Sequence, residues 1–149
     1  MTSMSAPVES ANRSSTLLHN LLWIAQAILA GIHGAAGVMK VSASLADLAV
    51  IFAWTSDASG PLIRFIGATE LAAAAGLLVP SWAQTRIGQA LTPIAAGAIA
   101  IAMMCASLFH FARGEALALR TTLLLCGLAA FVAWGRYRSA RAGRAPDRA

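Results

Sequence analysis

The amino-acid sequence predicts an all-α fold, a polytopic membrane four-helix bundle with both termini in the cytoplasm. Three observations predict this fold: the composition, four apolar segments of membrane-spanning length, and an uneven distribution of basic residues. Of the 149 residues, 58% are hydrophobic and only 11% are charged, and the mean hydropathy is +0.70. Soluble domains usually carry about a quarter charged residues, and a water-soluble chain of this length could not bury so much apolar side chain.

The four apolar segments each approach the ~20 residues that cross a hydrocarbon core of about 30 Å. The spans are expected at residues 17–39, 61–79, 89–111 and 117–135. Together they form one transmembrane domain of residues 17–136. Residues 1–16, which are rich in Ser, are predicted to form a disordered N-terminal tail, and residues 137–149 a basic C-terminal tail.

A long connection, VSASLADLAVIFAWTSDASG, joins the first two segments. Its middle, Leu45–Trp54, is apolar but too short to cross a membrane. We therefore expect a short helix that lies in the membrane interface, with Trp54 as an amphipathic anchor.

The basic residues predict the orientation, because cytoplasmic loops carry an excess of Lys and Arg. An even number of spans puts both termini on one side. That side has seven basic residues, namely Arg13, Arg86, Arg136, Arg138, Arg141, Arg144 and Arg148. The other side has four, namely Lys40, Arg64, Arg113 and Arg120. We therefore expect both termini in the cytoplasm, the 40–60 connection outside, and a multi-pass protein of the inner (cytoplasmic) membrane.

The net charge of +5 does not indicate nucleic-acid binding. Five arginines follow the last apolar segment directly, where a basic cluster anchors the chain at anionic lipid head groups. The sequence shows no basic and aromatic folded surface that could bind nucleic acid. The two cysteines, Cys105 and Cys126, form no CxxC motif, so neither a disulfide framework nor a metal site is expected.

Four polar residues recur at intervals of seven in the first segment, HNLLWIAQAILAGIHGAAGVMK. They are His19, Gln26, His33 and Lys40. Seven residues make nearly two helical turns, so the four side chains point in one direction. That direction is the bundle interior, because an ionisable group that faces lipid costs several kcal/mol.

The helical rise of about 1.5 Å per residue places other polar groups at similar depths. Glu70 lies near the membrane centre, and we expect His33 as its first partner, with Lys40 or Arg64 above. The candidate catalytic residues are therefore Glu70, His33 and His110. The candidate substrate-binding or charge-stabilising residues are Lys40, Arg64, Gln26 and Ser107. A structural polar clamp that fixes the helix order is the alternative interpretation of this cluster.

Four motifs resemble the DoxX and DoxX-like membrane proteins, in the same order along the chain. They are AGVMKV, FIGATELAAAAGLLVP, LTPIAAGAIAIAMMCASLFHFARGE and LLLCGLAAFVAWGR. The resemblance covers about residues 20–136 and implies a four-helix membrane bundle. It also implies that Lys40, Glu70 and His110 occupy the recurrent polar positions of the family. Members of the family are associated with membrane redox systems, including a thiosulfate:quinone oxidoreductase, and with superoxide dismutase and a sulfurtransferase.

These observations support competing functions. The first is an accessory protein or subunit of a quinone-linked membrane redox system, with a membrane-bound or peripheral redox partner and a quinone as the candidate cofactor. The second is a small membrane enzyme that performs acid–base chemistry on a lipophilic substrate, an isomerase, epoxide-opening enzyme or cyclase, with Glu70 as acid or base and His33 as its proton partner. A transporter or proton relay is the third. Haem is disfavoured, because the expected depths of His33 and His110 differ by about 8 Å. A homo-oligomer remains open.

Overall fold

The computed structural model describes residues 6–83 and 86–142, with side chains over 16–78 and 90–141. The described residues are helical apart from short turns, so the all-α prediction is confirmed for them. The elements are α1 (Ala6–Ser42), α2 (Leu45–Ile51), the 3-10 helix η1 (Ala53–Asp57), α3 (Gly60–Ala83), α4 (Arg86–Ala112) and α5 (Ala116–Ala142).

Four helices are long and apolar enough to cross a membrane, as predicted. The candidate spans are Thr16–Ser42, Gly60–Leu78, Ala90–Ala112 and Ala116–Arg141. Three of them agree with the predicted limits to within a few residues, and the fourth extends further at its C-terminal end. The side of the membrane on which the termini lie stays a prediction.

Helices α1 and α5 continue beyond the predicted transmembrane domain. Helix α1 begins at Ala6, inside the segment expected to be a disordered tail. No glycine or proline lies between Val8 and Ala30, so the helix of the first span can extend into the polar segment. Residues 1–5 and 143–149, which belong to the two predicted tails, lie outside the described residues.

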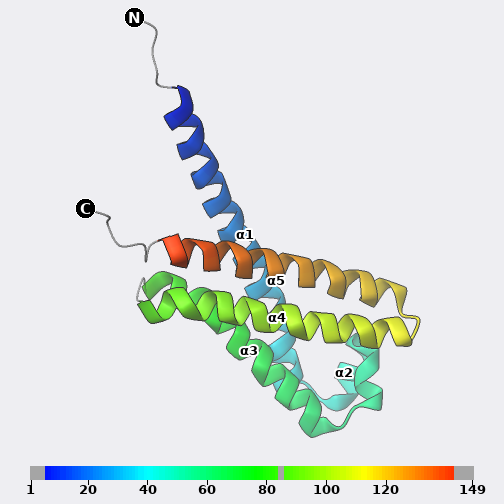
Figure 1. Ribbon diagram of the computed structural model, residues 1–149. Coiled ribbons are helices and arrows are strands. Elements are labelled where there is room, and N and C mark those ends of the chain that lie inside the picture. Colours follow the sequence, from blue (N-terminus) through cyan, green and yellow to red (C-terminus); the bar gives the residue numbers. More distant parts are fainter. Residues whose placement is uncertain (1–5, 84–85, 143–149) are drawn as a thin grey trace, which may run out of the picture.

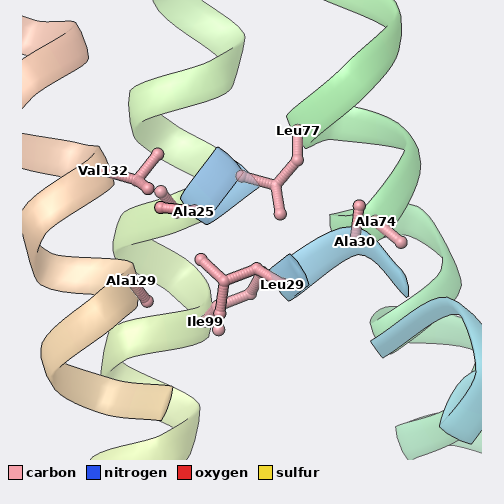
Figure 2. Close-up of a cluster of buried hydrophobic side chains, with 9 residues drawn as sticks. Ala25, Leu29, Ala30, Ala74, Leu77, Ile99, Ala129 and Val132 are labelled. Atoms are coloured by element: carbon pink, nitrogen blue, oxygen red, sulfur yellow. The ribbon is translucent and has the colours of Figure 1, made fainter. Parts of the chain in front are cut away.

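The four long helices form a closed ring of contacts. Helix α1 packs against α3 and α5, and α4 packs against the same two helices. Figure 1 shows α4 and α5 side by side, with α1 crossing them. The core of this bundle contains buried side chains from all four helices (Figure 2), namely Ala25, Leu29, Ala30, Ala74, Leu77, Ala96, Ile99, Ala129 and Val132. The core is rich in alanine because small side chains allow close helix packing where lipid provides no hydrophobic driving force.

Helices α1 and α3 cross at two glycines. A Cβ atom at Gly37 would lie 2.8 Å from the carbonyl oxygen of Gly67, and one at Gly67 would lie 2.7 Å from the Cβ of Lys40. Neither position has room for a side chain, so the two backbones approach as closely as glycine permits. This crossing brings the polar residues of α1 within reach of those on α3.

The connection between α1 and α3 contains the predicted short helix. Ser44 caps α2 at its N-terminus, where its hydroxyl accepts a hydrogen bond from the backbone N–H of Asp47 at 3.1 Å. Leu48 of α2 is fully buried, which fixes the connection against the bundle. Figure 1 places α2 near the turn between α4 and α5. An ion pair of 2.7 Å between Asp57 and Arg113 joins these two connections.

Candidate functional site

A buried ion pair joins α1 to α3. Lys40 Nζ donates hydrogen bonds to both carboxylate oxygens of Glu70, at 2.8 Å to Oε1 and 2.7 Å to Oε2. The side chains are 6% and 14% exposed, respectively. A buried charge requires a partner of opposite sign, and here each group supplies the other's partner. Helices α1 and α3 run antiparallel, and along their length Glu70 of α3 lies between His33 and Lys40 of α1. The long side chain of Lys40 spans the distance to the carboxylate.

His33 lies on the other side of the carboxylate. Its Nδ1 is 4.0 Å from Glu70 Oε1, which is longer than a hydrogen bond but close enough for an electrostatic contact. The side chain is 3% exposed, and its Nε2 has no hydrogen-bond partner among the described residues. The sequence predicted His33 as the first partner of Glu70, whereas in the structure Lys40 bonds the carboxylate directly and His33 is second.

Arg64 belongs to the same region but serves a different purpose. Its guanidinium donates to the backbone carbonyl of Lys40 and, at 2.8 Å, to that of Ala43. Carbonyls at the C-terminal end of a helix have no intrahelical partner. Arg64 therefore caps α1 and holds the Lys40 backbone in place.

Two aromatic rings from the connection cover the ammonium of Lys40. The Nζ atom lies 4.7 Å from the centre of the Phe52 ring and 6.0 Å from that of Trp54. A cation over an aromatic face is stabilised by the ring quadrupole, more so where water is excluded. Trp54 was predicted as an interfacial anchor, and the structure places it beside Lys40. We call His33, Lys40 and Glu70, with the Phe52 and Trp54 rings, the α1–α3 cluster.

Gln26 lies in a separate polar layer nearer the N-terminus of α1. Its Nε2 donates to the carbonyl of Leu77 at 2.7 Å, and its Oε1 accepts a hydrogen bond from Arg136 Nε. The guanidinium of Arg136 also lies 5.1 Å from the centre of the Trp23 ring. Gln26 thus joins α1 to α3 and α5, which is the behaviour expected of a structural clamp.

Ser107 and His110 are not part of the α1–α3 cluster. Ser107 donates to Met103 O at 2.7 Å and pairs with Thr122 Oγ1 at 2.8 Å, which joins α4 to α5. His110 Nδ1 lies 2.5 Å from Glu115 Oε2. The sequence grouped Ser107 and His110 with Glu70 as candidate site residues, whereas in the structure α1 and α3 supply the ionisable groups around Glu70.

The reason for the His110 contact is local. Helix α4 ends at a turn in which Gly114 has a φ of 70°, a conformation that glycine adopts without strain. The N–H of Glu115 then bonds the carbonyl of His110 at 3.0 Å. This turn folds Glu115 back onto the histidine. The sequence HFARGE contained this signal, a glycine three residues after the end of the predicted span.

Arg113 connects this turn to the first connection. It donates to Glu115 Oε1 at 2.6 Å and to Asp57 Oδ2 at 2.7 Å. The hydrogen bond from Arg113, followed by the contact with His110, holds the pKa of the Glu115 carboxyl below its ordinary value. The same carboxylates raise the pKa of Arg113. His110, Arg113, Glu115 and Asp57, which we call the turn network, form a surface link between two connections.

The described residues contain no group of three or more His, Cys, Asp or Glu side chains that could hold a metal ion. Cys105 is exposed, and Cys126 Sγ lies 3.4 Å from the carbonyl of Ala100, so the two thiols occupy different surroundings. Within the described part of the chain, the α1–α3 cluster is the place where a carboxylate, an ammonium and an imidazole lie together.

A model of the DoxX-like family matches residues 24–132 of the chain. The match contains all three ionisable residues of the α1–α3 cluster. Searches of curated proteins and of solved structures gave no match.

Proposed function

Because the chain belongs to the DoxX-like family, we propose that this membrane protein is a subunit or accessory protein of a quinone-linked redox system. In this proposal the α1–α3 cluster binds the quinone headgroup. Quinones reside in the bilayer, and the cluster lies between two helices that are long and apolar enough to cross it. The family membership and the chemistry of the cluster support this function together.

The observation that carries the proposal is the unpartnered Nε2 of His33. This atom is buried and has no hydrogen-bond partner in the described part of the protein. Leaving a buried polar group unsatisfied costs about 1–3 kcal/mol. A carbonyl oxygen of a bound ligand would remove that cost by accepting a hydrogen bond from this nitrogen. Both oxygens of Glu70 already accept from Lys40, so the available position of the cluster is on the imidazole.

The cluster also has the charges that quinone chemistry requires. A bound quinone would supply an acceptor for two electrons and two protons, and the electrons would come from a partner oxidoreductase. His33 has Nε2 for the ligand and Nδ1 turned toward the Glu70 carboxylate at 4.0 Å. An imidazole in this position can give up a proton at one nitrogen and regain one at the other. Lys40 stabilises negative charge that develops on a bound oxygen.

The experiment compares two histidines of the same helix. The purified protein in detergent is titrated with a short-chain ubiquinone analogue, and with a menaquinone analogue in a second series, by equilibrium dialysis. His33→Phe removes the hydrogen bond while it retains a ring, and we expect the dissociation constant to rise about tenfold. His19→Phe is the matched control, because His19 is exposed and its ring contacts the edge of the Trp23 ring.

The proposal is wrong if neither quinone binds the unaltered protein, or if His33→Phe and His19→Phe bind with equal affinity. A thermal melt of each variant shows whether lost binding reflects lost folding. Because His33 already has an unsatisfied nitrogen, we expect His33→Phe to fold.

A membrane enzyme that performs acid–base chemistry on a lipophilic substrate is the second candidate. It is favoured by the proximity of the imidazole of His33 to the carboxylate of Glu70. This function predicts that the purified protein alters at least one component of a membrane lipid extract, measured by mass spectrometry, and that Glu70→Gln abolishes the change. An unaltered extract removes this candidate.

A further inference from the structure

An apolar groove lies between α4 and α5, at the end of these helices that is opposite the turn network. Its volume is about 450 Å³. Helix α4 contributes Ala90, Pro93 and Ile94, and helix α5 contributes Ala133, Trp134, Tyr137, Ala140 and Arg141. The two helices lie side by side in Figure 1, where the C-terminal end of α5 is red, and the α5 residues that line the groove lie toward that end.

Among the described residues that line the groove, one is charged, Arg141 at its end. Arg141 is exposed, and its guanidinium lies 5.5 Å from the centre of the Tyr137 ring. One turn earlier, the guanidinium of Arg138 lies 5.1 Å from the centre of the Trp134 ring. Among the described side chains, neither arginine forms an ion pair with a carboxylate. The groove therefore combines an apolar trough with positive charge that no described carboxylate neutralises.

The positions along the spans set the depth of these groups. Ala90 begins the third candidate span and Arg141 ends the fourth, so both lie at one surface of the membrane. Trp134 and Tyr137 are the residue types that concentrate at the level of the lipid head groups. The alanine, proline and isoleucine side chains extend from that level toward the hydrocarbon core. A phospholipid has the same arrangement, because its charged head group is followed by apolar acyl chains.

We propose that this groove binds one membrane phospholipid with an acidic head group. An acyl chain lies against Pro93, Ile94 and Trp134, and the phosphate group accepts hydrogen bonds from Arg141. The argument for this occupant is charge complementarity joined to an apolar wall, and it is independent of the function proposed for the α1–α3 cluster. A basic residue near an anionic membrane surface strengthens binding by about fivefold.

The experiment uses the full-length protein in detergent and measures retained lipid by native mass spectrometry. Phosphatidylglycerol and phosphatidylcholine with identical acyl chains are titrated separately. We expect phosphatidylglycerol to bind about fivefold more tightly, and Arg141→Gln to reduce its affinity to that of phosphatidylcholine. Arg120→Gln is the matched control, because Arg120 is an exposed arginine at the opposite end of the same helix, and it should change neither affinity.

Two further measurements test the apolar part of the site. Ala133→Phe fills the groove and should weaken both lipids, while glycerol phosphate, which has the charge without the chains, should not compete with phosphatidylglycerol. The proposal is overturned if the two lipids bind equally, if Arg141→Gln and Arg120→Gln have the same effect, or if glycerol phosphate competes. Should Ala133→Phe fail to fold, the comparison of the two arginine variants, both at exposed positions, still decides.

Discussion

The two ends of the bundle hold their positive charges in different ways. At the end near α2, Lys40 bonds Glu70, and Arg113 bonds Asp57 and Glu115. At the other end the arginines lie over aromatic rings, in the pairs Arg136 with Trp23, Arg138 with Trp134 and Arg141 with Tyr137. None of these three arginines forms an ion pair with a carboxylate among the described side chains.

This difference shows which end of the bundle keeps positive charge available to groups outside the protein. A carboxylate neutralises a cation within the protein, and at the end near α2 this holds for Lys40 and Arg113, while Arg64 bonds backbone carbonyls. An aromatic ring stabilises a cation but leaves its charge in place. The arginine-rich end therefore remains able to bind anionic head groups, and such an end is the one expected on the cytoplasmic side.

The largest effect should come from separating the buried ion pair. Lys40→Met leaves the Glu70 carboxylate buried without its cation, and we expect the free energy of unfolding to fall by about 3–5 kcal/mol. Glu70→Gln should be less harmful, because Phe52 and Trp54 still contact the ammonium. The double variant Lys40→Met/Glu70→Gln should cost clearly less than the sum of the two single changes. The measurement is reversible unfolding of the detergent-solubilised protein.

The other polar layer provides the control for this prediction. Gln26→Leu removes the hydrogen bond to the Leu77 carbonyl and the acceptor of Arg136 Nε, while Arg136 keeps its contact with Trp23. We expect a loss of about 1–2 kcal/mol, the size of interhelical hydrogen bonds in membranes. Equal losses for Gln26→Leu and Lys40→Met, or additive effects in the double variant, would contradict the contrast between the two ends.

A second, smaller effect concerns the helix crossing that forms the ion pair. Gly37→Ala places a Cβ 2.8 Å from the backbone oxygen of Gly67. Neither atom is at the end of a flexible side chain, so the backbones of α1 and α3 must move apart. We expect a loss of about 1–3 kcal/mol from overpacking, measured by the same unfolding experiment. A weaker hydrogen bond between Lys40 and Glu70 should accompany it.

Gly31→Ala is the matched control on the same helix. No heavy atom lies within 4 Å of a Cβ built at Gly31. Alanine is the better helix former, so this change should be neutral or stabilising by up to about 1 kcal/mol. If both glycine variants behave alike, the close crossing does not position the cluster.

The sequence predicted the spans well because each depends on composition alone. Membrane thickness sets the length of an apolar helix, and four such lengths are visible in the chain. The short helix before Phe52 was also predictable, because Ser44 provides a capping residue and Leu48 an apolar anchor. The length of α1 was not, because the polar composition before Thr16 indicated a tail, while no glycine or proline between Val8 and Ala30 ends the helix.

The candidate site was predictable in part. A spacing of seven indicates which residues share a helix face, and this placed His33 and Lys40 together correctly. Helical rise gives the depth of a Cα atom but ignores the reach of the side chain, so it ranked His33 above Lys40 as a partner for Glu70. The contact between His110 and Glu115 depends on the left-handed turn at Gly114, which helical periodicity does not predict.

The smallest effect should appear at the turn network, where the charges are paired but exposed to water. The folded-state pKa of Glu115 lies below its ordinary value of 4.5, with the Arg113 hydrogen bond as the largest cause. A lowered carboxyl pKa stabilises the fold above the unfolded-state value, and this stabilisation is lost as the pH falls through the folded-state value. The difference in thermal midpoint between the unaltered protein and Glu115→Gln should therefore be present at pH 5 and should decline as the pH falls below 4.5 and through the lower folded-state pKa. The difference should be small at every pH, because solvent screens exposed pairs, and smaller still in an Arg113→Gln background.

Two outcomes would contradict this prediction: a difference in thermal midpoint that persists at the lowest pH, or one that is unchanged without Arg113. Either would show that Glu115 stabilises the turn by something other than this ion pair. The charges near α2 would then be less completely paired than the comparison of the two ends requires.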